Sequence, residues 1–193
     1  MRAFILCFAI SFSACLQAAE PRTENPSAVF LDSLFELAFV DVNPQSGITN
    51  EYLQDGDTLE EWTAMISVRQ WPEIDLVRDI TGPYLKQMQA SFVRDAQVFS
   101  PPPGTVGTDL IIELYLAPPD KSYLEYNLIR FGKEPGQHGV KMYQFALRGD
   151  FDLERAVPFN AQEMGPRLDQ LAKLRLQAIN SLPSKTPAGQ INR

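Results

Sequence analysis

The first nineteen residues constrain the fold most, because they contain both cysteines of the chain, Cys7 and Cys15. Arg2 gives a positive start, residues 3–14 form an almost unbroken apolar run, and small residues follow up to Ala19. This order is typical of a secretory signal peptide, and the run is too short for a permanent membrane-spanning helix. We therefore expect a mature chain without disulfides, in which the hydrophobic core alone must hold the fold.

Two cleavage sites fit this segment. Cleavage after Ala18 or Ala19 leaves a soluble periplasmic or secreted chain that starts near Glu20. Alternatively, residues 12–15 act as a lipoprotein signal and Cys15 becomes the lipidated first residue, which would place the protein at a membrane. Because Phe12 stands where Leu is usual, we expect the soluble form.

The mature chain, about 170 residues long, has the size of one ordinary domain. Loss of the signal peptide removes Arg2 and no acid, so the formal net charge moves from −7 to −8. Such an acidic chain repels nucleic acid and anionic lipid, and no further apolar segment could span a membrane. We expect a signal peptide over 1–19, a flexible lead-in over 20–28, one domain over 29–182 and a loose tail over 183–193.

In the first half of the mature chain, hydrophobic patterns alternate with turn signals. Thr58 and Glu61 have the spacing of a capping box, which predicts a short helix through Trp62. Ile74, Val77 and later apolar residues recur at helical spacing, although Gly82-Pro83 must kink that helix. The expected elements are strands at 29–42, 48–53 and 65–71, with helices at 58–62 and 73–90.

The second half shows clearer alternation. Leu110, Ile112, Leu114 and Leu116 share one face of an expected strand, and two more alternating strands follow after short loops. Such a series predicts an antiparallel meander with one covered face. The expected strands are 93–99, 109–117, 123–131 and 140–148, followed by a helix that Asn160 caps and that runs to Asn180. Together these elements predict a single α+β domain, a twisted antiparallel sheet with helices packed on it.

Few residues of the mature chain could carry catalysis. His138, the only histidine, lies in a glycine-rich loop, and no Gly-x-Ser-x-Gly element accompanies it. A serine triad, a cysteine nucleophile and a zinc or copper site are therefore not expected, nor is any cofactor. Asp150, Asp152 and Glu154 would share one face of an extended chain and could hold Ca²⁺, but three solvated carboxylates are the simpler interpretation.

Aromatic residues offer another candidate site. Tyr115, Tyr123, Tyr143 and Phe145 fall on neighbouring expected strands. If their face of the sheet is open, it would suit a protein partner, and the alternative is that a helix or loop covers it. For Trp62 we expect a structural role, with its ring packed between helix and sheet.

Two parts of the chain resemble segments of small secreted proteobacterial proteins that form an uncharacterised family. They are residues 50–65, with Asn-Glu-Tyr-Leu and Gly-Asp-Thr-Leu-Glu-Glu-Trp, and the strands at 126–131 and 143–148. The order of elements is also similar to the Mog1/PsbP-like α/β/α sandwich, a resemblance that implies a binding or assembly role. The leading hypothesis is a non-enzymatic periplasmic binding or accessory protein. An immunity protein against a periplasm-acting toxin and a carboxylate-based hydrolase are the alternatives.

Overall fold

The computed structural model describes residues 26–44, 47–152 and 161–181. The expected signal peptide, Cys15, Glu154, Asn160 and the expected tail beyond residue 182 lie outside the described residues. Within them, eight strands form one antiparallel sheet, in the order β1-β2-β3-β4-β8-β7-β6-β5. The strands are β1 (Ser27–Phe30), β2 (Ser33–Asn43), β3 (Gly47–Leu53), β4 (Ala64–Trp71), β5 (Gln97–Phe99), β6 (Leu110–Leu116), β7 (Leu124–Gly132) and β8 (Val140–Gly149). The helices are α1 (Val77–Met88) and α2 (Ala161–Lys173), with a 3₁₀ turn at Gln89–Ser91.

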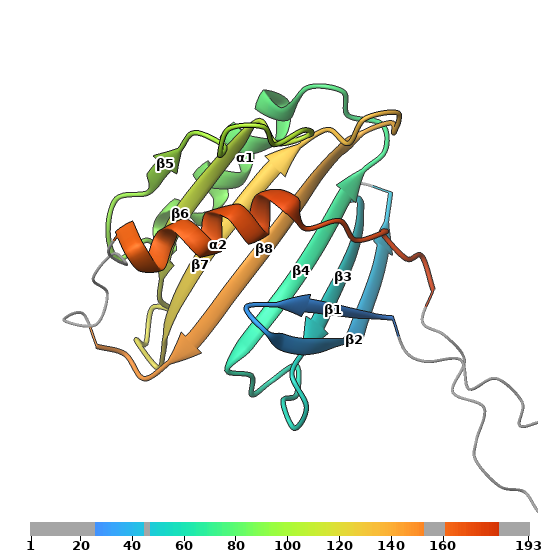
Figure 1. Cartoon of the computed structure of the whole chain (residues 1–193). Helices are drawn as coiled ribbons and strands as arrows, with labels where there is room; N and C mark the ends of the chain where they lie inside the picture. Colours follow the sequence, from blue (N-terminus) through green and yellow to red (C-terminus); the bar gives the residue numbers. More distant parts are fainter. Residues whose placement is uncertain (1–25, 45–46, 153–160, 182–193) are drawn as a thin grey trace, which may run out of the picture.

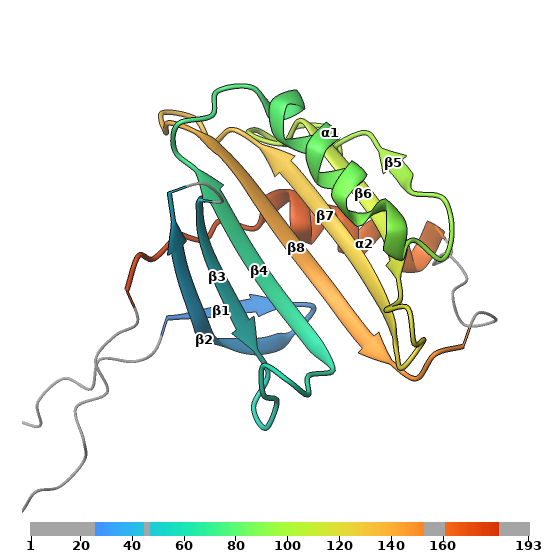
Figure 2. The same ribbon diagram turned by 180° about the vertical axis from the view of Figure 1, so that it is seen from behind.

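The expected meander is confirmed in β6, β7 and β8, and the expected single domain follows from how the two halves join. Strand β4 pairs with β8 along its whole length, from Ala64 opposite Leu147 to Trp71 opposite Val140. The first four strands and the last four are thereby one continuous sheet, with α2 on one face and α1 on the other (Figure 1, Figure 2). The chain is a single domain, and most of it is sheet. None of the helices in the described residues is long and apolar enough to cross a membrane.

Strand alternation divides the core as the sequence predicts. Ile112, Leu114 and Leu116 of β6 are buried together with residues of α1, whereas Ile111 and Tyr115 belong to the cluster that contains α2. The cause is the two-residue period of a strand, which sends neighbouring side chains to opposite faces. The meander is therefore covered on both faces, which corrects the expectation of one covered face.

The expected first strand at 29–42 is wrong, because the chain turns back within it. Leu31 and Asp32 form the tip of a β1–β2 hairpin, with φ angles of 49° and 61°. Positive φ at both central residues is characteristic of a type I′ turn, which normally carries Asn or Gly. A Leu-Asp pair gives no such signal, so the hydrophobic pattern looked continuous.

The expected helix at 58–62 is also wrong. The capping contact exists, since Thr58 Oγ1 accepts a hydrogen bond from the Glu61 amide at 3.0 Å, but the Thr58 amide donates to the Glu61 carbonyl at 2.9 Å and closes a turn. Asp57 Oδ2 then accepts from the Thr63 amide at 3.0 Å, just before β4 begins. Too few residues separate the cap from the strand to repay the cost of starting a helix.

Both long helices are shorter than expected. Helix α1 begins at Val77 rather than residue 73 and contains Pro83, while the strand expected at 93–99 is ordered as β5 only over Gln97–Phe99. Helix α2 ends at Lys173 rather than near Asn180. The chain after α2 continues without helical structure to residue 181, because side chains of the sheet bind the carbonyl groups at the helix end.

Candidate functional site

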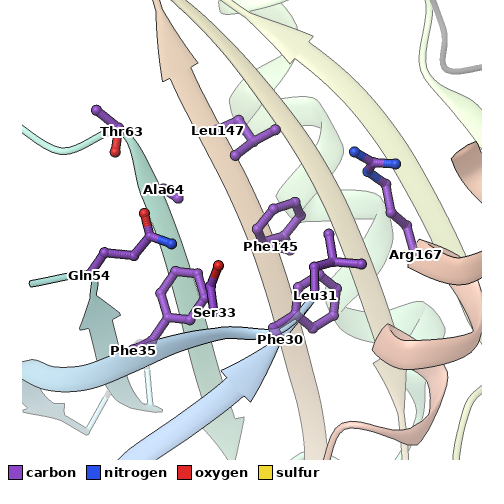
Figure 3. Close-up of a pocket in the computed structure, with 10 residues that line it drawn as sticks. All are labelled: Phe30, Leu31, Ser33, Phe35, Gln54, Thr63, Ala64, Phe145, Leu147 and Arg167. Atoms are coloured by element: carbon purple, nitrogen blue, oxygen red, sulfur yellow. The ribbon is translucent and has the colours of Figure 1, made fainter.

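The candidate site is a pocket between the β1–β2 hairpin, the sheet and α2. The hairpin lies across the α2 face of the sheet (Figure 1), and its tip contacts α2 where the Leu31 amide donates to Gln170 Oε1 at 2.7 Å. Beneath it is a pocket of about 290 Å³ (Figure 3). Its lining residues are Phe30, Leu31, Ser33, Phe35, Gln54, Thr63, Ala64, Phe145, Leu147 and Arg167.

Apolar side chains form most of this pocket. The rings of Phe30 and Phe145 lie with their centroids 4.6 Å apart, so the hairpin packs directly on β8. Ala64 and Leu147 are opposite each other in the β4–β8 pairing and continue the apolar lining. A cavity with an apolar lining and a few polar groups is the usual form of a small-molecule site.

Arg167 is the only charged residue among the ten that line the pocket. Helix α2 fixes the backbone position of Arg167, and its Nη1 donates to the Glu163 carbonyl, one turn earlier in the helix, at 2.8 Å. Figure 3 shows Arg167 on one side of the pocket and Gln54 and Thr63 on the other, with Phe145 and Leu147 between them. The pocket is therefore polar at its sides and apolar in between.

A row of tyrosines continues from the pocket beneath α2. Leu147 is opposite Tyr126 in β7, and Tyr126 is opposite Tyr115 in β6. Burial raises the pKa of Tyr115 to about 12 and raises that of Tyr126 further, while the charge of Arg167 opposes part of each rise. Both hydroxyls are thus neutral at physiological pH.

Glu113 lies one row further along the same face, only 1% exposed. Burial raises the pKa of its carboxyl group, and the Arg94 charge and the Tyr126 hydroxyl partly offset this rise. Glu113 and Tyr115 are two residues apart in β6 and therefore share a face of the sheet. Glu113 lies outside the pocket lining, so it does not face a ligand there.

A second buried polar group closes the far end of α2. Arg130 Nη1 donates to the carbonyls of Leu171, Ala172 and Leu174 at 2.8–3.1 Å, and its Nη2 pairs with Glu134 Oε1 at 2.9 Å. The Tyr143 hydroxyl also donates to Glu134 Oε1, at 2.9 Å. Because Arg130 satisfies the carbonyls that a helix end leaves open, this group serves to end α2 and to hold it on the sheet.

The α1 face carries polar residues beside α1, which we call the polar stripe. Glu51, Ser67 and Gln144 are neighbours across β3, β4 and β8, and Glu125 pairs with Arg148 on the same face. Burial raises the pKa of Glu51 and of Glu125. The negative charge of Glu125 raises the pKa of Glu51 further. Figure 2 shows α1 over β6 and β7, which leaves β3 and β4 to one side of it.

The expected open aromatic surface is not present. Tyr115, Tyr143 and Phe145 are buried in the cluster that includes α2, and Tyr123 is half-buried, with the Arg148 guanidinium 4.2 Å from its ring centre. The alternative expectation, that a helix covers this face, is confirmed. These residues contribute to the core, and Phe145 contributes also to the pocket.

The structure does not gather the remaining candidates into a site. His138 is exposed in the β7–β8 loop, as expected. Asp150 is exposed and Asp152 half-buried after β8, while Glu154 falls outside the described residues. Among the described residues, no group of three or more His, Cys, Asp or Glu side chains is placed to hold a metal ion.

Sequence reasoning missed the pocket because it missed the hairpin. The hydrophobic pattern predicts one strand through Phe30 and Phe35, whereas they enter the pocket from two strands joined by the Leu31-Asp32 tip. Arg167 gave no signal, since an arginine in an amphipathic helix is usually solvated. An unusual positive-φ turn without glycine cannot be recognised from hydrophobic alternation.

Comparison with known proteins places the chain in a family without assigning it an activity. No curated protein and no solved structure matches it. A protein-family model matches residues 26–184, which include the whole sheet and both helices. The chain therefore belongs to that family, an uncharacterised one.

Proposed function

We propose that the chain is an exported, non-enzymatic binding protein that holds a small apolar ligand beneath the β1–β2 hairpin. The observation that carries this proposal is the pocket itself, with its apolar lining of hairpin, β4 and β8 residues. Ser33 and Thr63 are in the lining, but none of the ten lining residues is His, Asp or Glu, the usual bases that would activate such a hydroxyl.

The hairpin tip gives further support. Leu31, a branched residue at positive φ, costs about 1–2 kcal/mol relative to ordinary backbone geometry. Such strain persists only where the surroundings impose it, and it is common at binding sites. Here the Gln170 side chain holds the Leu31 amide and thereby fixes the wall of the pocket.

A pocket-filling substitution tests this proposal. The probe is 1-octanol, added to the mature chain and followed through backbone amide shifts by NMR. We expect saturable shifts at pocket residues and their loss in Ser33→Leu, because Ser33 lines the pocket. Ser27→Leu is the matched control, since Ser27 is on the same hairpin but exposed.

Two outcomes would contradict the proposal. One is the absence of saturable shifts in the parent protein. The other is equal 1-octanol affinity in Ser33→Leu and Ser27→Leu, with both variants melting at the parent temperature. Either would show that the pocket does not take up apolar ligands.

A carboxylate-based hydrolase is the second candidate, and one observation favours it. Glu51 and Glu125 lie on one face of the sheet and both have a raised pKa. A carboxyl group with a raised pKa can act as a general acid near neutral pH. Turnover in a screen of glycan and ester substrates, abolished by Glu51→Gln or Glu125→Gln, would favour this candidate over the binding protein.

The proposed export can be tested separately. We propose cleavage after Ala18 or Ala19, which releases a soluble domain into the periplasm or the medium. Intact-mass spectrometry of the mature protein should then give a mass that begins at residue 19 or 20. A diacylglycerol-modified Cys15, or membrane retention that Cys15→Ser removes, would show lipoprotein processing instead.

A further inference from the structure

We propose that two copies of this chain pair through the free part of strand β2, Ala38–Val42, and thereby join their sheets into one. Strand β3 pairs with β2 on one side along this part. On the other side, β1 pairs only with residues 33–36, and the Leu37 amide donates to the Pro26 carbonyl. Beyond that point β2 is the outermost strand (Figure 1, Figure 2), and within the described residues no backbone group binds the outer side of Ala38–Val42. A strand with such an open edge is a template for pairing with another chain.

The opposite edge of the sheet is closed, which makes the open edge of β2 distinctive. Strand β5 is three residues long, Gln97–Phe99, and Pro101-Pro102-Pro103 follows shortly after it. Where β5 does not reach, Phe92 forms a β-bridge with Leu116 of β6. Short strands, prolines and covering segments are common means by which proteins prevent edge-to-edge pairing. The sheet is therefore protected at one edge and open at the other.

The free part of β2 carries none of these protections. Residues 38–42 read Ala-Phe-Val-Asp-Val, without proline or lysine. The bulge between Leu37 and Phe39 lies at the start of this part and leaves the residues after it in regular pairing with β3. Val42 is 53% exposed, and the partly buried Val40 packs at the margin of the core. Contact with a second copy would remove this apolar surface from water.

Symmetry and charge favour one register for the pairing. Two identical strands pair antiparallel about a two-fold axis, which here is perpendicular to the sheet. An axis at Val40, the middle of the free part, places Val40 opposite Val40 of the second copy and Asp41 opposite Phe39 of the second copy. An axis at Asp41 would instead place two carboxylates directly opposite each other, where like charges are destabilising. An axis at Phe39 would require Leu37 to pair, although its amide already binds the Pro26 carbonyl.

The pairing is reversible, because a short strand segment buries less area than a permanent interface does. Each copy also carries a net negative charge, so two copies repel each other at long range. Salt screens this repulsion. We therefore expect a dimer that forms as the protein concentration rises and that added salt strengthens.

Sedimentation equilibrium of the mature chain between about 1 µM and 1 mM tests the dimer. We expect the mean mass to rise from that of one copy toward that of two. Val42→Lys should raise the dissociation constant about tenfold or more, because a lysine at a strand edge opposes pairing. Val98→Lys is the matched control, since it makes the same change at an exposed valine of the opposite edge strand, β5, and should leave the dissociation constant unchanged.

Single cysteines test the register, because the mature chain expected here has no cysteine of its own. In Val40→Cys the two thiols face each other across the axis, and opposite residues of paired strands have a Cα separation that suits a disulfide. Oxidised glutathione, which is itself reduced in the reaction, should then link the copies. Val42→Cys is the control, because Val42 lies opposite Ala38 of the second copy and its two thiols are far apart along the strands. We expect a covalent dimer in Val40→Cys and little of it in Val42→Cys, although Val42 is the more exposed residue.

Three results would overturn the proposal. The first is a chain that stays monomeric up to about 1 mM. The second is a dimer that Val42→Lys weakens no more than Val98→Lys does, with both variants melting at the parent temperature. The third is faster linkage in Val42→Cys than in Val40→Cys. If Val40→Cys does not fold, the two lysine variants alone decide, and none of these results depends on the pocket.

Discussion

Arg130 and Arg148 lie on opposite faces of the sheet, and each contacts an aromatic ring and a carboxylate. They differ in how deeply they are buried. Arg130 on the α2 face lies 4.3 Å from the centre of the Tyr143 ring and pairs with Glu134 at 2.9 Å. Arg148 on the α1 face lies 3.9 Å from the centre of the Trp62 ring and pairs with Glu125 at 3.6 Å. The Arg130 side chain is 0% exposed and that of Arg148 is 20% exposed. The same combination of arginine, ring and carboxylate is thus a buried cluster in one place and a partly solvated one in the other.

The two faces of the sheet also differ in how deeply their residues are buried. On the α2 face, one continuous cluster of buried residues extends from the hairpin across the sheet to α2. On the α1 face, a cluster beneath α1 and a small one around Trp62 are separate, and the polar stripe runs on the same face. This difference shows that strand alternation assigns side chains to a face, while the element packed on that face decides how deeply they are buried.

The largest expected loss of stability follows replacement of Arg130, and the same replacement of Arg148 is the comparison. Arg130→Met should lower the free energy of unfolding by about 3–5 kcal/mol, because Glu134 loses its fully buried cation and keeps only the more exposed Arg175, and the carbonyls at the end of α2 lose a buried donor. Arg148→Met should lower it by about 1–2 kcal/mol, because water compensates a partly exposed pair. Urea unfolding of both variants, followed by circular dichroism, measures the difference.

Equal losses in the two variants would break the comparison between the faces. Amide hydrogen exchange gives a second readout. Exchange at the end of α2 should accelerate in Arg130→Met and stay unchanged in Arg148→Met, since Arg130, unlike Arg148, binds the helix carbonyls.

A smaller loss is expected for Trp62→Ala. Trp62 is buried with Leu53, Met65 and Ala146 on the α1 face and lies beneath Arg148. Its removal should cost about 3 kcal/mol, the lower end of the range for a buried tryptophan, because this cluster is small. Thermal melting measures the loss, and 1-octanol binding is the accompanying control because Trp62 is not in the pocket lining. A variant that melts like the parent would remove Trp62 from the structural core.

The smallest effect concerns pH. The pKa of Glu113 is raised by burial, so the folded state holds its proton more tightly than the unfolded state. The resulting stabilisation is fully present below the unfolded pKa near 4.5 and is lost as pH rises through the folded pKa. Glu113→Gln should therefore stabilise the protein slightly at pH 7 and bring no advantage at pH 4.

Urea unfolding at the two pH values measures this change. Glu73→Gln is the control, since Glu73 is exposed. If Glu113→Gln destabilises the protein at pH 7, the ionised carboxylate is favoured in the fold and the assigned direction is wrong.

Local hydrophobic patterns predict the strands and helices whose residues alternate regularly between one side and the other. The strands β6, β7 and β8 follow the two-residue alternation almost to the residue, and Ile112 and Ile111 point to opposite faces as that period requires. The hairpin was not predictable, because Leu31 and Asp32 adopt positive φ without a residue type that favours it. Contacts elsewhere in the molecule, including the one from Gln170, supply the stabilisation that the turn itself lacks.

The sequence by itself determined the sheet-dominated α+β domain and the assignment of β-strand residues to two faces, because both depend on periods of two or four residues along the chain. The tertiary structure decided where α2 ends, through Arg130 on a distant strand, and it decided that Phe30, Phe145 and Arg167 line one pocket. Those residues are far apart in sequence and contribute no shared local pattern. Their meeting depends on a strained turn and on long-range hydrogen bonds, whose free energies arise only once the whole sheet has formed.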